Sequence, residues 1–207
     1  MAVFTPSISK LINKIKKCKK CSHLKNPKPI FSPIKNSKVL IIGQAPGKKE
    51  KELGLPFVGP AGKKLFSWFQ KIGFTEKNIR KNLYITQVIK CYLESNRLPK
   101  AIELKNCLPY LYSEIELLKP KIIIPIGILA IKTILGKKKI DEVIGKVFKW
   151  KNSLIIPLPH PSGANVWLNK KENQRKIKKA LKEIKNYFKA TNITLKESFF
   201  AGKKVRC

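Results

Sequence analysis

With 207 residues, 43% of them hydrophobic, the chain is long enough for one domain with its own core, and this composition excludes a disordered protein. The longest apolar run, Ile122–Ile131, is interrupted by Pro125 and Gly127 and is too short to span a bilayer, and no apolar segment precedes the first lysines, so we expect a cytoplasmic protein without a membrane anchor. The formal net charge of +33 favours nucleic acid as a partner. Only four of the 45 basic residues are arginine, however, a bias that A/T-rich coding also produces.

Helices and strands alternate along the chain. Apolar residues at helical spacing predict five helices, over residues 7–17, 60–73, 100–118, 127–135 and 172–188. Short apolar runs bounded by glycine, proline or asparagine predict strands at Val39–Ile42, Leu83–Ile89, Lys121–Ile126, Val147–Trp150 and Leu154–Leu158. This alternation indicates a mostly parallel sheet with helices on both faces, so we predict a single three-layer α/β/α domain over residues 1–189.

Three predicted loops follow the carboxyl ends of strands, at residues 43–59, 90–99 and 159–169. Ligand sites of open α/β sheets form at those ends, so we expect the functional site where the three loops meet. Residues 190–207 break the pattern and are expected to form a loose basic tail.

Four of the five cysteines are spaced like metal ligands. Cys18 and Cys21 form a Cys-x-x-Cys pair, Cys91 and Cys107 follow with 15 residues between them, and Cys207 stands apart. Two thiolates on a tight turn plus two from elsewhere complete a tetrahedral zinc site or hold a [4Fe–4S] cubane, in either case with a structural role. The spacing differs from the two pairs of a zinc ribbon, which disfavours zinc without excluding it. Cys107 on its own would be an ordinary core cysteine of an apolar helix face.

The loop after the first strand carries the densest motif. It runs Gly43-Gln44-Ala45-Pro46-Gly47 and continues as Gly54-x-Pro56-Phe57-Val58-Gly59-x-Ala61-Gly62. A P-loop needs four residues between its glycines and Lys-Ser/Thr after the second, whereas this loop has three residues followed by Lys48-Lys49. Nucleotide binding of the P-loop kind is therefore excluded.

Together with two further segments, this loop closely resembles the ordered motifs of the family 4 (iron–sulfur) uracil-DNA glycosylases. The further segments are Thr86-Gln87-Val88-Ile89-Lys90-Cys91 and His160-Pro161-Ser162, and the order of the cysteines is similar too. The resemblance covers roughly residues 15–188. It implies a central four-stranded, mostly parallel sheet, a [4Fe–4S] cluster on Cys18, Cys21, Cys91 and Cys107, and hydrolysis of the bond between a flipped-out uracil, or a related deaminated base, and its sugar.

The same resemblance assigns roles to single residues. His160 matches the donor to the base carbonyl, Gln44 takes the position of the residue that positions water, and Phe57 matches the aromatic ring that stacks on the base. Gly43 and Ala45 would form the pocket wall, and Gln87 would read the base edge. The residues expected to contact DNA and to hold the duplex open are Ser162, Gly163, Asn165, Val166 and Trp167, with Val166 or Trp167 as the wedge.

Three positions depart from the family pattern. Gln44 replaces a glutamate, Gln87 replaces an asparagine, and Lys51 replaces an acidic residue. A glutamine orients water but is no general base, so Glu50 is a candidate for the missing carboxylate, with a solvated loop charge as the alternative. Gln87 keeps the amide donor and acceptor but reaches one methylene further. These changes leave the target base open among uracil, hypoxanthine, xanthine and other deamination products.

Two other functions stay open at this stage. The chain would also suit a non-catalytic module that binds lesions or single strands and retains the fold and cluster, or a zinc-stabilised adaptor whose basic surface reflects coding bias alone. For the glycosylase, we expect DNA as the partner, no membrane contact, a monomer, and a place at the nucleoid of the cytoplasm.

Overall fold

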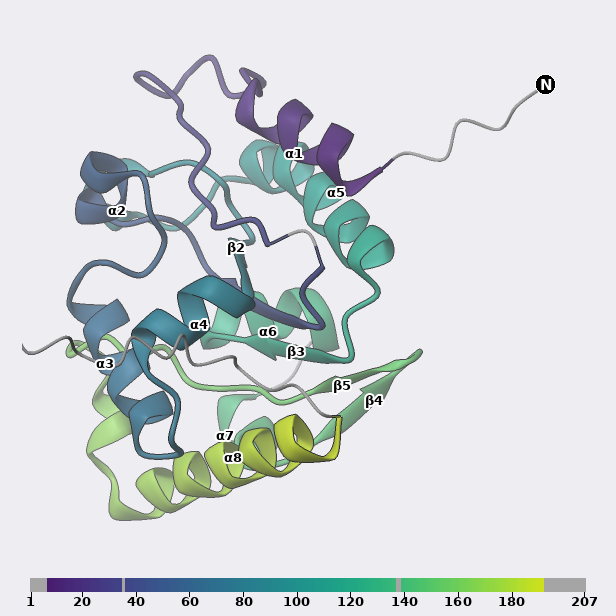
Figure 1. Cartoon of the computed structure of the whole chain (residues 1–207). Helices are drawn as coiled ribbons and strands as arrows, with labels where there is room; N and C mark the ends of the chain where they lie inside the picture. Colours follow the sequence, from purple (N-terminus) through teal and green to yellow (C-terminus); the bar gives the residue numbers. More distant parts are fainter. Residues whose placement is uncertain (1–6, 35, 137–138, 192–207) are drawn as a thin grey trace, which may run out of the picture.

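The computed structural model describes residues 7–34, 36–136 and 139–191, which form an α/β domain around one sheet (Figure 1). The strands follow the order β2-β1-β3-β5-β4. The first four of these are mutually parallel, and β4 runs antiparallel to β5. Their bounds are β1 (Val39–Gly43), β2 (Tyr84–Gln87), β3 (Ile122–Pro125), β4 (Phe148–Trp150) and β5 (Ser153–Ile155).

The described part of the chain has five strands, as many as the apolar runs predicted and one more than the four-stranded sheet that the family resemblance implied. Four parallel strands are present as expected, and a hairpin adds the fifth. Phe148 pairs with Ile155 and Trp150 with Ser153, and the connecting Lys151 takes a positive φ of 51°. The hairpin places β4 at the edge of an otherwise parallel sheet, which is a common position for an antiparallel strand.

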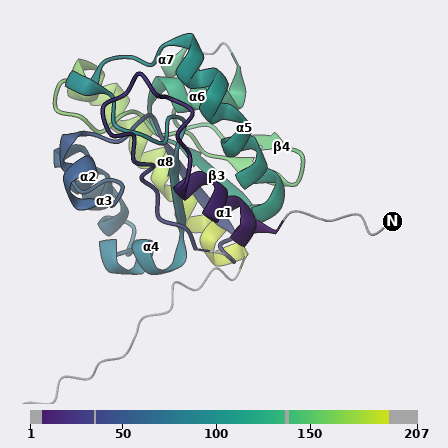
Figure 2. The ribbon, with the colours of Figure 1, turned by 90° about the horizontal axis from the view of Figure 1, so that it is seen from above.

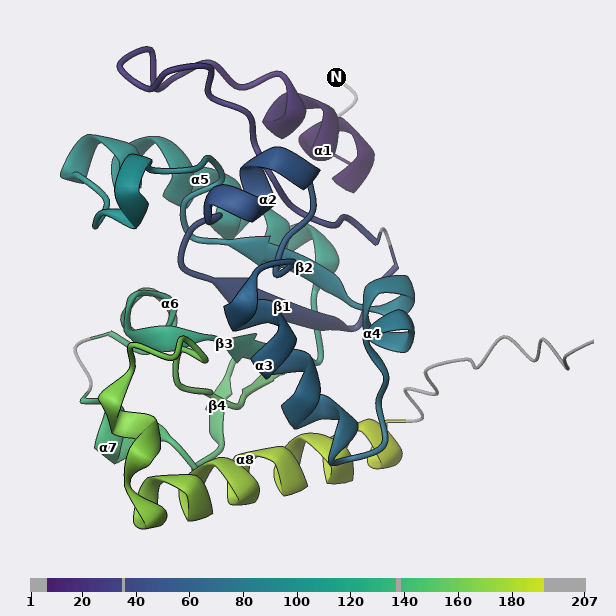
Figure 3. The same cartoon turned by 90° about the vertical axis from the view of Figure 1, so that its left-hand side faces the viewer.

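Helices cover both faces of the sheet, which confirms the three-layer prediction. Figures 1 and 3 show α1 and α5 on one side of the sheet and α3 and α8 on the other. The helices are α1 (Ile8–Lys16), α2 (Lys48–Leu53), α3 (Pro60–Gln70), α4 (Glu76–Asn82), α5 (Ala101–Leu118), α6 (Gly127–Leu135), α7 (Ile140–Val143) and α8 (Lys171–Ala190). Figure 2 shows α2, α3 and α4 following one another along one flank of the domain. The predicted tail is described only at its start, since α8 ends at Ala190 and residues 192–207 lie outside the described residues.

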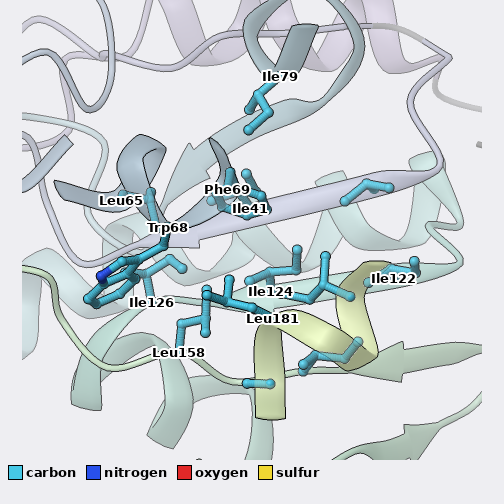
Figure 4. Close-up of a cluster of buried hydrophobic side chains, with 14 of the residues drawn as sticks. Ile41, Leu65, Trp68, Phe69, Ile79, Ile122, Ile124, Ile126, Leu158 and Leu181 are labelled. Atoms are coloured by element: carbon cyan, nitrogen blue, oxygen red, sulfur yellow. The ribbon is translucent and has the colours of Figure 1, made fainter. Parts of the chain in front are cut away.

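Alternate residues of each central strand pack into two separate cores. Val39 and Ile41 of β1 lie in the cluster with α3, α4 and α8, whereas Leu40 and Ile42 lie in the cluster with α1 and α5. Successive side chains of a strand point to opposite faces, which explains the unbroken apolar run of β1. Figure 4 shows the first cluster, in which Trp68 and Phe69 of α3 approach the strands and Leu181 of α8.

The carboxyl ends of β1, β2, β3 and β5 lie at one edge of the sheet. Beyond β3 and β5, Ile126 and Leu158 form a further parallel bridge, and the Gly127 N–H donates to the Leu158 carbonyl at 2.9 Å. This pairing carries the chain from β5 to His160 at the same edge as the loop after β1. Within the described ranges, no helix has the length and apolarity needed to cross a membrane.

Candidate active site

The three loops predicted to meet at the sheet edge enclose one cavity of about 520 Å³. Its walls come from the loop after β1, the end and following loop of β2, and the loop after β5. Residues that line it include seven named as site candidates from the sequence: Gln44, Ala45, Glu50, Phe57, Gln87, His160 and Ser162. The expected convergence of the loops is therefore confirmed.

His160 lines this cavity as a half-buried, neutral imidazole. Burial lowers the pKa of His160 below its ordinary value, so the ring is uncharged near neutral pH. The backbone N–H of Ser162 donates to Nδ1 at 3.3 Å, which places the single ring proton on Nε2. The side-chain amide of Asn165 donates to the His160 carbonyl at 2.8 Å and fixes the backbone of the same loop. The site thus presents a neutral N–H donor.

The imidazole packs against a glycine at the start of α6. Gly127 has a φ of +82°, and a β-carbon there would lie 3.0 Å from Cβ and 3.2 Å from Cδ2 of His160. Both the backbone conformation and the space therefore require glycine at this position.

Phe57 lies against the end of β1 and is buried. A β-carbon on Gly43 would approach the ring atom Cζ of Phe57 to 2.9 Å, so Gly43 is the residue that lets the ring lie flat against the strand end. Gly43 itself is not among the lining residues of the cavity. Phe57 has a positive φ of 54°, a conformation that costs a residue with a side chain roughly 1–2 kcal/mol. The surrounding contacts must offset that cost.

Gln87 is the last residue of β2 and is almost fully buried where it meets the cavity. Its backbone carbonyl accepts from the ammonium of Lys90 at 2.8 Å. Lys90 is itself buried, with its ammonium 2.7 Å from Glu114 Oε2 and 2.6 Å from Thr86 Oγ1. The Gln44 carbonyl accepts from Ile89 N–H at 2.9 Å, which ties the loops after β1 and β2 together. A buried, satisfied polar network therefore holds the two glutamines at the cavity.

Glu50 borders the cavity, but backbone groups already occupy its carboxylate. Oε2 accepts from Gly47 N–H at 3.0 Å, and Oε1 accepts from the N–H groups of Val58 and Gly59 at 2.9 and 2.8 Å. Glu50 is therefore not the solvated loop charge that the sequence left open as one alternative, since the side chain is buried and both of its oxygens accept hydrogen bonds. Its contacts join the Gln44–Gly47 segment to the segment after Phe57.

The loop after His160 divides into an exposed tip and an anchored part. Val166 is 76% exposed, whereas Trp167 packs against the hydrophobic core and donates from its indole N–H to Asp141 Oδ1 at 2.7 Å. Gly163 and Asn165 lie outside the main cavity and line an adjoining groove between α3 and α8. Of the two wedge candidates, Val166 is the one free to contact a ligand.

The cavity also contains residues that the sequence analysis did not single out. Arg97 lines it, and its Nη1 donates at 2.9 Å to Oε2 of the fully buried Glu103. The hydrogen bonds from Arg97 lower the pKa of Glu103 to about 2 despite burial, and His23 adds a contact of 2.9 Å to Oε1. The sequence signals for Arg97 were its position in a loop that follows a strand and the rarity of arginine in this chain.

The four cysteines named as metal ligands line a second, enclosed cavity. Cys18 and Cys21 follow α1, Cys91 follows β2, and Cys107 lies on α5. All four are free thiols, and neither a histidine nor an acidic residue lines the cavity. Burial, followed by the neighbouring Cys107, Cys21 and Cys18 thiols, raises the pKa of Cys91 to about 12. No three histidine, cysteine or acidic side chains in the described ranges are arranged to hold a single metal ion.

The sequence of this chain is similar to those of known proteins from one family. Residues 29–185 match the family model described as the uracil DNA glycosylase superfamily. The chain is 37% identical over 150 residues to a type-4 uracil-DNA glycosylase of Pyrobaculum aerophilum, covering 69% of this chain and 74% of that protein. It is 35% identical over 187 residues to the type-4 uracil-DNA glycosylase of Saccharolobus solfataricus, covering 83% and 85%. The corresponding protein of Sulfurisphaera tokodaii is 32% identical over 169 residues, with 76% of each chain covered.

Proposed function

The chain belongs to the uracil-DNA glycosylase superfamily, and we propose that its main cavity receives a uracil flipped out of DNA and cleaves the base from its sugar by hydrolysis. The observation that carries the proposal is that a neutral imidazole, two glutamines and an aromatic ring from three separate loops line one cavity. The resemblance to type-4 enzymes found in the sequence is confirmed by the relatives. The protein is thus a DNA-repair enzyme rather than an adaptor.

Cleavage leaves negative charge on the departing base and positive charge on the sugar. His160 Nε2–H is a donor to the base carbonyl and stabilises that negative charge as it develops, like the donor of an oxyanion hole. A neutral donor suits this role because it gives up no proton to the leaving base. Gln44 orients the water that attacks the sugar, and the dissociative character of the cleavage makes a strong base unnecessary.

The proposed base pocket selects its substrate by stacking and by one amide. The Phe57 ring stacks on the base, and the Gln87 amide offers a donor and an acceptor to the base edge. Ala45 contributes to the wall beside Gln44. Flipping costs a few kcal/mol and is cheapest for mispaired bases, which adds selectivity for a deaminated cytosine opposite guanine.

Glu50 is a positioning residue in this scheme. Its carboxylate accepts three backbone N–H groups, and protonation would weaken these bonds and loosen the loop, which favours a structural role. The carboxylate that we considered from the sequence as a catalytic substitute is therefore assigned to loop structure.

DNA would lie across the mouth of the cavity, with Ser162 at its rim and Val166 pressed into the duplex. Asn165 and the backbone of Trp167 hold this loop in place, so only the apolar tip enters the base stack. We propose that the protein acts as a monomer on chromosomal DNA in the cytoplasm.

The thiol-lined cavity fits an iron–sulfur cluster. Its donor set is four thiols from three parts of the chain, walled by apolar side chains such as Leu24 and Ile89. Four thiolates are the usual ligands of [4Fe–4S], and bound iron would offset the burial that raises the pKa of the Cys91 and Cys107 thiols. We propose that Cys18, Cys21, Cys91 and Cys107 hold such a cluster in a structural role, and metal analysis that finds zinc in place of iron would contradict it.

The proposal is tested with labelled oligonucleotides that each carry one uracil, hypoxanthine or xanthine, as single strands and as duplexes. After incubation, alkali cleaves every abasic site. We expect product from uracil, and Gln44→Ala and Gln87→Asn variants assayed beside the wild type show whether either glutamine sets the choice of base. Binding to the modified strands without product from any of them would instead identify a non-catalytic lesion-binding module.

A further inference from the structure

The backbone at Phe57 is held by an arginine that lies outside the cavity. Arg80, on α4, donates from Nη1 to the Pro56 carbonyl and from Nη2 to the Phe57 carbonyl, both at 2.9 Å. Two adjacent carbonyls that accept from one planar guanidinium are fixed in direction as well as position. The guanidinium therefore determines the orientation of the peptide unit that follows the Phe57 ring.

Arg80 is itself rigidly placed. Its Nε donates to Glu76 Oε1 at 2.7 Å, one turn earlier on α4, and its guanidinium lies 4.7 Å from the centre of the Phe66 ring on α3. The side chain is only 20% exposed. Nε, Nη1 and Nη2 of the group thus each donate to a partner, and little freedom remains for it to turn.

The opposite side of the same segment is equally restricted. Glu50 accepts from the N–H groups of Val58 and Gly59, and a β-carbon on Gly62 would overlap the Phe57 carbonyl. Phe57 is therefore enclosed between a cation that holds the carbonyls on one side and an anion that holds the following amides on the other. This arrangement maintains the left-handed conformation of a residue that would otherwise favour another one.

We propose that Arg80 is a positioning residue for catalysis. It acts only through Phe57, because it fixes the Phe57 backbone so that the ring lies where it can stack on the flipped base. The proposal rests on the proposed function, in which Phe57 stacks on that base. A purely structural alternative is that Arg80 joins α4 to α3 and contributes stability alone. The two roles differ in whether the effect of removing Arg80 depends on the Phe57 ring.

The first test is a double-mutant cycle of Arg80→Met and Phe57→Ala, measured as single-turnover excision of uracil with DNA affinity and thermal midpoint recorded in parallel. Lys81→Met, next on the same exposed helix, is the matched control because it removes the same charge. We expect Arg80→Met to lower the rate about ten- to hundredfold, since small misplacements of a contact group have effects of this size. In the Phe57→Ala background the same change leaves the rate unaltered. Equal losses in both backgrounds, or a wild-type rate for Arg80→Met, would overturn the proposal.

The second test does not need activity. Hydrogen exchange of the peptide that contains Pro56–Gly59 should accelerate in Arg80→Met and in Arg80→Lys, which keeps the charge but cannot bond both carbonyls in one plane, and remain slow in Lys81→Met. Unchanged exchange of this peptide contradicts the positioning role even if the variants lose activity. If the wild type excises no base at all, the glycosylase assignment fails, while the exchange result still decides whether Arg80 holds the segment.

Discussion

The loop cavity and the cysteine cavity both include residues that follow β2, but they differ in size and in the side chains that line them. The base pocket, with Gln87 at its wall, is large and polar, and its shape depends on hydrogen bonds to backbone groups of three loops. The cavity of the four cysteines, with Cys91 at its wall, is enclosed and carries no acidic or histidine side chain. Lys90 lies between the two and is fully paired with Glu114.

The contrast suggests a division of roles, with catalysis in the loop cavity and structural support in the cysteine cavity. Loops that must admit a nucleobase cannot be filled with apolar side chains, so polar contacts to the backbone hold them. The proposed cluster would join the N-terminal segment, the β2 loop and α5 at one point, so the neighbouring pocket would not have to hold these segments together. If the roles are separate, a substitution in one cavity should leave the measured properties of the other unchanged.

The largest effect is expected from removal of two thiols on the β2 side. Cys91→Ser with Cys107→Ser should prevent binding of the proposed cluster and lower the free energy of unfolding by more than about 4 kcal/mol, as losses of a structural metal do. Iron content and the thermal midpoint measure this effect, with Cys207→Ser as the matched control outside the four-thiol set. A double variant that retains iron and the wild-type midpoint would show that no cluster on these cysteines stabilises the fold.

Next in size is the loss of the imidazole in the base pocket. His160→Ala should lower the single-turnover rate of uracil excision by about two to three orders of magnitude, the effect of losing one oxyanion donor, while DNA affinity and iron content stay unchanged. Rapid-quench assays with enzyme in excess give the rate. An undiminished rate would exclude His160 from the mechanism.

A smaller effect is expected at the exposed tip of the His160 loop. Val166→Ala should slow excision from duplex DNA about fivefold, because it removes roughly 1 kcal/mol of apolar contact with the base stack. No change is expected on single-stranded substrate, where no stack has to be held open. Ile102→Ala on α5, also an exposed apolar side chain, is the control, and equal losses on both substrates would argue against a wedge.

The smallest effect concerns pH. Because burial lowers the folded-state pKa of His160, the ring stays neutral as the pH falls through its ordinary value of 6.5, and the excision rate should decline only below that value. An unfolded chain takes up the proton earlier, so stability decreases as the pH falls below 6.5. NMR titration of the imidazole, identified by its disappearance in His160→Ala, gives the midpoint directly. A midpoint above 6.5 would contradict the neutral donor.

Much of the site was predictable because strand ends and motifs constrain it. Apolar runs located β1, β2 and β3, and the carboxyl-end rule brought the loops of Gln44, Gln87 and His160 together before any geometry was known. The role of Glu50 was not predictable, since its three partners are the backbone N–H groups of Gly47, Val58 and Gly59, which lie on both sides of α2. The short helices α2, α4 and α7 were missed because they contain too few turns to show a helical period.

The contacts of Arg80 and Arg97 were beyond the sequence for a similar reason. Each guanidinium bonds partners that no spacing rule connects, such as the Phe57 carbonyl and the Glu103 carboxylate. Arginine is rare in this lysine-rich chain, so each arginine was a candidate for a specific structural contact. A lysine ammonium cannot replace the planar guanidinium in such a contact.

The bare α-carbon of Gly127 beneath the imidazole has a consequence for variation at this position. Substitution there would strain the first turn of α6 and displace the ring of His160 in a single step. Variation at residue 127 is therefore expected to change the stability of the fold and the position of the His160 imidazole together. The missing β-carbon at this one position thus serves both the start of α6 and the placement of the imidazole.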